Sequence, residues 1–254
     1  PGETKSIKIP ITRINNVQGS TATFLMNANG GKYTIERSMD FSACVNDGVT
    51  PQLDGVLSPG EWDGCQVITD TTNTDSLKSA NMTAADCSWK LYRKWDEENL
   101  YIAVDVTDDV FYQAWTGGDM WQGDNLQIAL DQTRTEGVGC ATTDYFELGV
   151  SRNPETEELD TWAWLADILV KRDVTVQGCV GKTSRSEDGH TIYEIKIPWA
   201  YLYEKPQIEE YSMIGFSFVV NDNDGKGRKL GGSYMNGIAD ASKNPNSFED
   251  MVLV

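Results

Sequence analysis

The chain has 254 residues and a formal net charge of −18, with 39% hydrophobic residues and eight tryptophans. This length suits one large β domain, or one domain with a small appendage. Such an acidic surface argues against nucleic acid and anionic membranes as partners, because both favour basic patches, and it suits a neutral ligand. We find no apolar run that could span a membrane and no signal-peptide pattern, so we expect an excised or mature fragment with no membrane partner.

Residues 1–46 predict a β-strand segment that precedes the main domain. The strand patterns cover 7–14, 21–27 and 32–45, and Asn29-Gly30-Gly31 is a hairpin signal between the last two. So few strands bury too little surface to stand alone. We expect them to be the end of an upstream immunoglobulin-like domain, packed here onto the main domain, which begins at residue 47.

The main domain, residues 47–254, opens with a stretch that predicts an anchor. Leu53 is apolar, Asp54-Gly55 is a tight-turn pair and Trp62 is a large aromatic residue. Residues 70–86 are polar and predict a long loop. Further strands are predicted over 88–95, 100–106, 125–131, 144–151, 161–170, 174–185, 190–197, 213–220 and 247–254.

Few helical signals interrupt this pattern. Pro198 ends a strand because proline lacks the ladder donor, a short helical turn is predicted over 200–204, and residues 221–227 form a long turn. No helical period lasts long enough for a βαβ unit. The predicted fold class is therefore all-β, an antiparallel β-sandwich of jelly-roll or immunoglobulin-like type with ten or more strands.

The stretch from Val104 to Asp131 is the predicted functional centre. A strand runs into the paired acids Asp108 and Asp109, and a loop with Tyr112, Trp115 and Trp121 follows before the next strand begins. A rigid sandwich commonly carries its binding surface on such a loop.

Catalytic patterns are weak in this chain. His190 is the only histidine, it follows a Gly turn at a strand start, and no GxSxG nucleophile motif is present. Among 39 acids, carboxylate pairs of the kind a glycosidase uses are inevitable and therefore uninformative. We expect no enzyme.

The cysteines leave two alternatives open. They show no CxxC spacing, which disfavours a zinc site. An exported protein could form up to two disulfides from them, and free, mostly buried thiols are an equal alternative. The five are Cys44, Cys65, Cys87, Cys140 and Cys179.

Six stretches in order carry a family resemblance. They are LDGVLSPGEW (53–62), LYIAVDVTDD (100–109), WQGDNLQIALD (121–131), YEIKIPWAYL (193–202), IGFSFVVNDNDGKGRK (214–229) and NPNSFEDMVLV (244–254). Residues 47–254 thus resemble carbohydrate-binding module family 9 (CBM9-like) and its DOMON-like sandwich relatives. The strands before Cys44 are similar to the end of the β domain that often precedes such modules.

The resemblance implies a sugar site around Trp121. The best-described members grip a terminal sugar between two Trp rings, and one ring falls at Trp121, whose indole face can cover the CH face of a pyranose. A structural Trp at the rim is an equal alternative. The second ring falls at Ser242, which cannot stack, so Tyr112, Trp115 or Tyr234 would supply the other wall.

The polar positions of the implied site are mostly changed. The family's Glu falls at Gln127, its Arg and Asn fall at Glu147 and Gly149, and its Gln falls at Val219. Its basic residue after the Gly-rich turn survives as Lys229. We therefore expect Trp121, Trp115, Tyr112, Gln127, Glu147, Lys229 and Tyr234 to form a different sugar-binding set.

The resemblance also implies structural calcium. Asp108, Asp109 and Asp124 offer hard oxygen ligands around one loop, and their alternative role is in turns and caps. The turn at 221–227 is not an EF-hand loop, because Val220 stands where the first Asp should be.

The implied function is a non-catalytic module, either secreted or at the cell surface. It would bind a plant cell-wall polysaccharide such as xylan or an oligosaccharide, beside the other domains of a multimodular glycoside hydrolase. The alternatives are a structural or protein-interaction module, and a haem-binding electron-transfer domain that would use His190 with Met26, Met82 or Met120.

Overall fold

The computed structural model describes residues 20–28, 31–39, 41–69, 79, 82–131, 145–165, 179–201, 208–234, 245 and 248–254. Strands dominate these ranges, with two short 3-10 turns, η1 (Gly117–Gln122) and η2 (Trp199–Tyr201). The strands are β1 (Ser20–Ala28), β2 (Gly31–Met39), β3 (Phe41–Cys44), β4 (Ile68–Thr69), β5 (Cys87–Trp95), β6 (Asn99–Asp108), β7 (Asn125–Asp131), β8 (Tyr145–Arg152), β9 (Leu159–Leu165), β10 (Val180–Arg185), β11 (His190–Pro198), β12 (Met213–Asp222), β13 (Lys229–Tyr234) and β14 (Glu249–Leu253).

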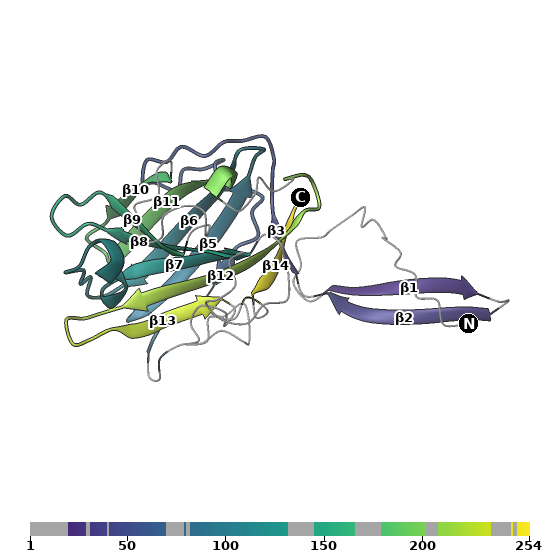
Figure 1. Ribbon diagram of the computed structural model, residues 1–254. Coiled ribbons are helices and arrows are strands. Elements are labelled where there is room, and N and C mark those ends of the chain that lie inside the picture. Colours follow the sequence, from purple (N-terminus) through teal and green to yellow (C-terminus); the bar gives the residue numbers. More distant parts are fainter. Residues whose placement is uncertain are drawn as a thin grey trace.

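Two sheets form the body of the molecule (Figure 1). The five-stranded sheet has the order β10-β11-β6-β5-β4. The seven-stranded sheet has the order β3-β14-β12-β7-β8-β9, with β13 also paired to β12. All of these pairs are antiparallel except β14 with β3, which is parallel. The fold is a β-sandwich, as the sequence predicts.

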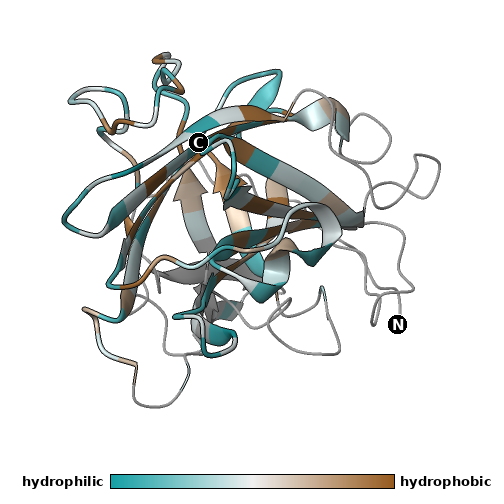
Figure 2. Ribbon diagram, turned by 90° about the vertical axis from the view of Figure 1, so that its left-hand side faces the viewer, coloured by the Kyte–Doolittle hydropathy of each residue, from teal (hydrophilic) through white to brown (hydrophobic). Residues whose placement is uncertain are grey.

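Alternating apolar side chains from both sheets fill the space between the layers. Figure 2 shows the ribbon from one end, with hydrophobic residues in brown along the strands. In β7 the alternating residues Leu126, Ile128 and Leu130 share one face and are buried in this core. Trp89 of β5 meets Phe218 of β12 edge to face, with ring centroids 5.1 Å apart. Cross-layer contacts of this kind supply most of the apolar burial that holds a sandwich together.

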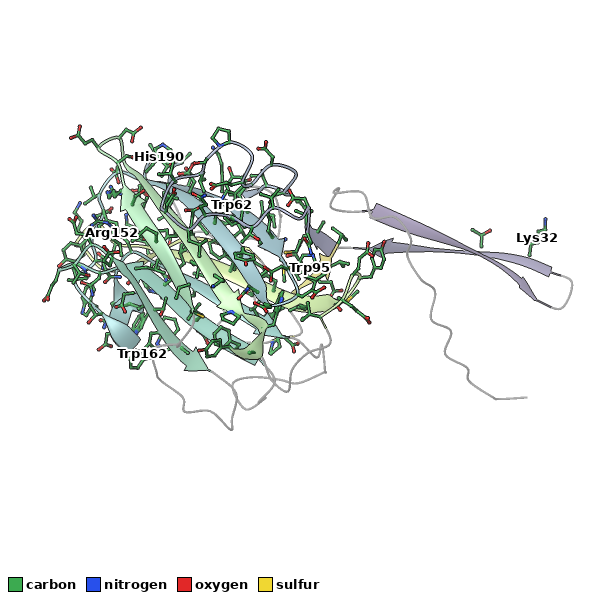
Figure 3. The ribbon with its side chains drawn as sticks, turned by 90° about the horizontal axis from the view of Figure 1, so that it is seen from above. Lys32, Trp62, Trp95, Arg152, Trp162 and His190 are labelled. Carbon is green, nitrogen blue, oxygen red and sulfur yellow. The ribbon has the colours of Figure 1, made fainter. Side chains whose placement is uncertain are left out.

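The stretch after residue 47 is clamped onto the outer side of the five-stranded sheet. The buried Glu194 of β11 accepts hydrogen bonds from the backbone N–H groups of Asp54 (3.0 Å) and Gly55 (2.8 Å) and from Trp62 Nε1 (3.0 Å). Gly55 has a φ of 84°, a conformation that favours glycine, so the predicted Asp-Gly turn and Trp anchor are both present. Figure 3 labels Trp62 on this side of the sandwich.

The N-terminal strands divide between two positions. β3 pairs with β14 at the edge of the large sheet, and Arg93 of β5 reaches both Ser42 of β3 and Glu249 of β14 in the interior. β1 and β2 pair with each other across a two-residue connection, as the hairpin signal predicts. Their hairpin extends away from the sandwich, with Lys32 near its far end (Figures 1 and 3). The division of the chain at residue 46 stays a prediction.

The observed elements follow most of the predicted ones, but the strand predicted over 32–45 divides into β2 and β3, and the short β4 was not predicted. Pro198 ends β11, and the turn after β12 is a hairpin turn, as predicted. The sequence missed β13, whose Gly-rich start hides its strand pattern. Predictions over 7–14, 132–144, 166–178, 202–207 and 235–244, including Cys140 and Ser242, lie outside the described residues.

Cys44 and Cys179 are buried thiols, and burial raises the pKa of both. Among the described residues, no helix is long and apolar enough to cross a membrane.

Two tryptophans should respond differently to truncation because their burial differs. Trp199 is 4% exposed, whereas Trp121 is 40% exposed. We expect Trp199→Ala to lower the free energy of unfolding by about 3–5 kcal/mol, the usual cost of deleting a buried aromatic side chain. Trp121→Ala should lower it by less than about 1 kcal/mol. Urea unfolding followed by far-UV circular dichroism measures both, and equal losses would contradict the assignment of Trp199 to the core.

Candidate functional site

One end of the sandwich gathers most of the polar and aromatic residues singled out above. β6 and β12 end there, and β7 and β13 begin there. The loop between β6 and β7 (residues 109–124, here the aromatic loop) lies beside the turn between β12 and β13 (residues 223–228, here the glycine turn). Two segments separated by about a hundred residues therefore build one surface.

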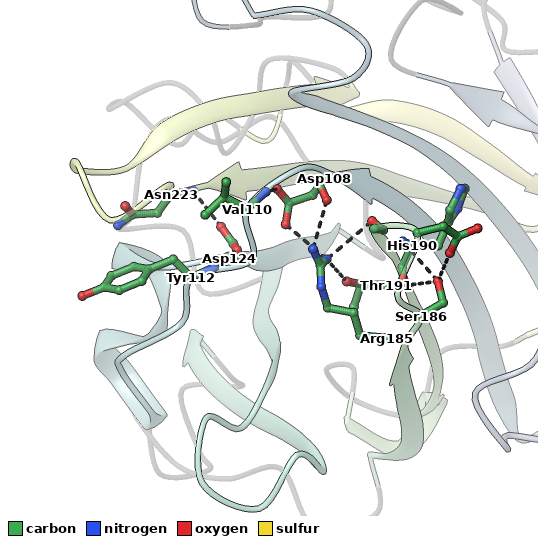
Figure 4. Close-up of polar contacts among 11 residues, drawn as sticks. Asp108, Val110, Tyr112, Asp124, Arg185, Ser186, His190, Thr191 and Asn223 are labelled. Carbon is green, nitrogen blue, oxygen red and sulfur yellow. Dashed lines mark hydrogen bonds and ion pairs between the residues drawn. The ribbon is translucent and has the colours of Figure 1, made fainter.

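Asp124 joins the aromatic loop to the glycine turn (Figure 4). Its Oδ2 accepts a hydrogen bond from the backbone N–H of Tyr112, and its Oδ1 accepts one from the N–H of Asn223 at 2.6 Å. The Asp124 N–H in turn donates to the Tyr112 carbonyl at 3.1 Å. Asn223 adds a second link through its Nδ2, which donates to the Gln122 carbonyl at 2.6 Å.

Gln113 organises the interior of the aromatic loop. Its buried side-chain amide donates to the carbonyls of Met120 and Asp124, both at 3.0 Å, and accepts from the N–H of Trp115 at 2.9 Å. A loop held by so many buried hydrogen bonds presents its side chains in a fixed arrangement.

The three predicted aromatic residues lie on this fixed frame. Tyr112 and Trp121 are each 40% exposed, and Trp115 is partly buried. The rings of Tyr112 and Trp115 meet edge to face with centroids 6.0 Å apart. A Cβ at Gly225 would stand 3.7 Å from the Tyr112 ring, so Tyr112 packs against the glycine turn. The structure thus leaves large parts of two rings of the aromatic loop, Tyr112 and Trp121, open to solvent.

A polar network extends from Trp121 across the sheet. The guanidinium of Arg228 lies over the Trp121 ring, with Cζ 5.4 Å from the centroid, and NH1 donates to Asn221 Oδ1 at 2.8 Å. Asn221 Nδ2 donates to Asn125 Oδ1 at 2.9 Å and to Gln127 Oε1 at 3.1 Å. Of the polar residues in this network, sequence reasoning named only Gln127. Arg228 and Asn221 were missed, although both flank the Gly-rich turn.

The remaining predicted sugar contacts are placed less favourably. Glu147 accepts from Gln127 Nε2 at 3.4 Å but is fully buried. Lys229 is directed away from Trp121, toward the carboxylates of Asp86, Asp222 and Asp224. Tyr234 lies in β13 opposite Phe218, and its side chain is outside the described part of the chain, as is Ser242. The structure therefore links Gln127 to Trp121 through Asn221 and Arg228. Tyr112 and Trp115 contact each other on the same loop as Trp121, whereas Lys229 contacts the acids instead.

A cluster of acidic residues lies beside this surface. Carboxylate oxygens of Asp108, Asp109 and Asp224 lie within 4.8 Å of one another, and so do those of Asp86, Asp222 and Asp224. Asp224 belongs to both groups and takes the place that the sequence prediction gave to Asp124. The oxygens of Asp124 are used instead by the two backbone N–H groups described above. The sequence did contain a signal for Asp222 and Asp224, because two acids two residues apart lie where β12 enters the glycine turn.

The electrostatics of this cluster are unfavourable without a cation. Burial and the neighbouring acids raise the pKa of Asp222 to about 7 and the pKa of Asp124 to about 9. Asp222 is 1% exposed, and neither of its carboxylate oxygens has a hydrogen-bond donor. Lys229 Nζ lies 3.6 Å from Asp222 and 2.5 Å from Asp224, and Arg185 NH1 lies 3.3 Å from Asp108 (Figure 4). Closely spaced carboxylates, which outnumber the two neighbouring cations and offer hard oxygen donors, fit a divalent cation such as Ca²⁺.

His190 has a local structural partner. Its Nδ1 lies 2.7 Å from Asp105 Oδ1, on the outer side of the five-stranded sheet. Met120 of η1 packs its side chain against Gly149, and Met82 packs on the main core, while the side chain of Met26 is outside the described part. The described residues therefore lend no support to a haem site.

A rigid β-sandwich that presents exposed aromatic rings over a network of buried amides at one end has the architecture of a binding module. The chain belongs to the family described as "Carbohydrate family 9 binding domain-like", whose profile matches residues 53–254. It is 25% identical over 209 residues to endo-1,4-beta-xylanase A of Thermotoga neapolitana, and 25% identical over 185 residues to exoglucanase XynX of Acetivibrio thermocellus. These matches cover 81% and 72% of this chain, but the chain spans only 17% and 14% of those relatives.

A solved structure shares the fold. A family 9 carbohydrate-binding module from Caldicellulosiruptor kristjanssonii, in complex with cellotriose, superimposes with a TM-score of 0.60 at 20% identity. The match covers 83% of this chain and 92% of that one.

Removing the carboxylate of Asp124 should loosen both loops of the site. Asp124→Ala leaves two buried N–H groups without an acceptor, which costs about 1–3 kcal/mol for each buried group. We expect the amide hydrogens of Tyr112 and Asn223 to exchange faster in this variant. Asp119→Ala is the matched control, because Asp119 is exposed on the same loop and its side chain accepts only from Gln122 Nε2, at 3.2 Å, within the described residues. Unchanged exchange in Asp124→Ala would contradict the proposed link.

Proposed function

We propose that this chain is a non-catalytic module that binds a plant polysaccharide or its oligosaccharides through the surface around Trp121. The observation that supports it is the exposed Trp121 ring beside a fixed row of amide and guanidinium groups. An indole face suits the CH face of a pyranose, and side-chain amides suit its ring of hydroxyls.

The preorganisation of the two loops favours binding. Asp124, Asn223 and Gln113 hold the aromatic loop and the glycine turn together before any ligand arrives. The loops therefore lose their conformational entropy when the protein folds, and ligand binding does not have to order them again. Tyr112, which packs on the glycine turn, is the described ring best placed to extend the Trp121 surface.

The relatives support an accessory role within a larger protein. The two curated relatives are named as a xylanase and an exoglucanase, and this chain corresponds to a small part of each. We infer that the module directs a multidomain glycan-degrading enzyme to its substrate, with xylan and β-glucans as the leading ligand classes. Function outside the cell follows from the size of such substrates.

Neutral oligosaccharides test this proposal directly. We expect binding of xylo- or cello-oligosaccharides in the micromolar to millimolar range, which corresponds to roughly −8 to −4 kcal/mol. Trp121→Ala should weaken that affinity more than Trp199→Ala does, when both variants are folded at the assay temperature. Isothermal titration calorimetry supplies the measurement.

Two results would count against the Trp121 surface. Flat titrations of the parent protein against xylan, glucan, mannan and pectin panels would favour a structural role. Full affinity in Trp121→Ala would move the ligand to another surface.

We also propose that Ca²⁺ binds at Asp108, Asp109 and Asp224, with Asp222 close by. The shared position of Asp224 and the donorless oxygens of Asp222 support this assignment. Lys229 Nζ lies within 4.0 Å of all three acids of the Asp86, Asp222 and Asp224 group and takes the place of an ion there, whereas no described cation reaches all three of Asp108, Asp109 and Asp224. We therefore assign the metal to the second group. The ion would offset the repulsion among acids at the base of both loops.

Chelation tests the calcium proposal. EDTA should lower the melting temperature and added Ca²⁺ should restore it, because a ligand at a hundredfold excess over its dissociation constant stabilises the folded state by about 2.7 kcal/mol. Asp109→Asn should reduce the response, whereas Asp63→Asn, an exposed acid outside the cluster, should retain it. Identical melting curves after confirmed metal removal would exclude a stabilising ion.

A further inference from the structure

Arg228 differs from the other arginines whose side chains the structure describes. Arg93 pairs with Glu249, Arg152 with Glu157 and Arg185 with Asp108, each at 3.1–3.3 Å. Within the described residues, Arg228 has no carboxylate within 4.0 Å and contacts only an amide oxygen and the Trp121 ring. In a chain with 39 acids, an arginine kept apart from all described carboxylates has its charge available for a ligand.

The Arg228 guanidinium is held in a defined position. Asn221 is 1% exposed and accepts from Arg228, while its own Nδ2 is committed to Asn125 and Gln127, which fixes the orientation of the amide. Asn223 Oδ1 accepts from the N–H groups of Gly225 (2.8 Å) and Gly227 (3.2 Å) and so shapes the turn that carries Arg228. The guanidinium Cζ lies over the Trp121 ring, and Arg228 is exposed to solvent.

We propose that Arg228 binds the carboxylate of a uronic acid, so that the module prefers a neutral sugar chain bearing an acidic substituent. This inference rests on the proposed sugar site at Trp121 and names its ligand class more narrowly. An arginine fork matches a carboxylate with two parallel hydrogen bonds, and the adjacent indole face covers the CH face of the same or the next sugar ring. Gln127 and Asn125, joined to Arg228 through Asn221, fix where that ring lies.

The net charge limits how acidic the ligand is. A formal charge of −18 repels polyanions over a distance of about one Debye length, roughly 8 Å at physiological salt. A single ligand carboxylate in direct contact with Arg228 forms a short-range ion pair. In a continuous polyuronate, every further carboxylate is instead repelled by the acidic protein. Sparse uronic acids on a neutral hemicellulose backbone satisfy both conditions, and polygalacturonate does not.

A set of three matched ligands tests this preference. These are a β-1,4-linked xylo-oligosaccharide with one glucuronic acid branch, the methyl ester of that branch, and the unbranched oligosaccharide. For the parent protein at pH 7 and low salt, we expect the free acid to bind on the order of tenfold more tightly than its methyl ester. Arg228→Gln should make the two affinities equal. Lys226→Gln removes an exposed cation from the same turn and should leave the preference intact.

The outcomes separate this inference from the proposed function. Equal affinities for acid and ester in the parent, with binding of the unbranched chain retained, would overturn the role of Arg228 and leave the sugar site standing. A preference for the free acid that survives in Arg228→Gln would likewise overturn the role of Arg228 and leave the sugar site standing. Tighter binding of the unbranched chain by Arg228→Gln, with no preference in the parent, would mean that the guanidinium only covers the ring. Binding of none of the three ligands would refute the sugar site and this inference together.

Discussion

The carboxylate of Asp124 is the constraint on which the candidate site depends. It is buried between two segments that are far apart in sequence, and it accepts one backbone N–H from each. A buried carboxylate must be satisfied by donors, and here the donors are those that bring the aromatic loop onto the glycine turn. The position of Trp121 and Tyr112 relative to Arg228 follows from this one residue and from Asn223 beside it.

The two faces of the glycine turn carry opposite chemistry. Arg228 lies over Trp121, while its neighbour Lys229, the first residue of β13, is directed to Asp86, Asp222 and Asp224. Side chains of successive residues at the start of a strand point to opposite sides of the sheet. A register shift of one residue would therefore direct Lys229 to Trp121 and Arg228 to the acidic cluster. The same alternation separates an aromatic surface that carries the Arg228 cation from an acidic cluster at the same end of the sandwich.

Buried charges also hold the outer segments to the sandwich. Glu194 fastens the stretch around Gly55 and Trp62 to the five-stranded sheet, and Arg93 joins β3 and β14 to β5 while its guanidinium lies 4.5 Å from the Phe216 ring centroid. Removing one partner from such a group leaves the other buried and unpaired. The resulting loss of stability is larger than the net stabilisation that the intact pair provides. These groups therefore specify where the segments dock, while apolar burial between the layers supplies the stability.

The sequence by itself determined the sandwich, because alternating apolar residues and turn signals are local properties that survive without knowledge of pairing. It also determined the anchor at Trp62, the end of β11 at Pro198 and the aromatic loop between β6 and β7. Only the tertiary structure decided which polar side chains meet. It joined Asp224 to Asp108 and Asp109, gave both oxygens of Asp124 to backbone amides, buried Glu147, and turned Arg228 rather than Lys229 toward Trp121. Those contacts cross between segments about a hundred residues apart, so their partners depend on strand register and turn geometry, which no local pattern encodes.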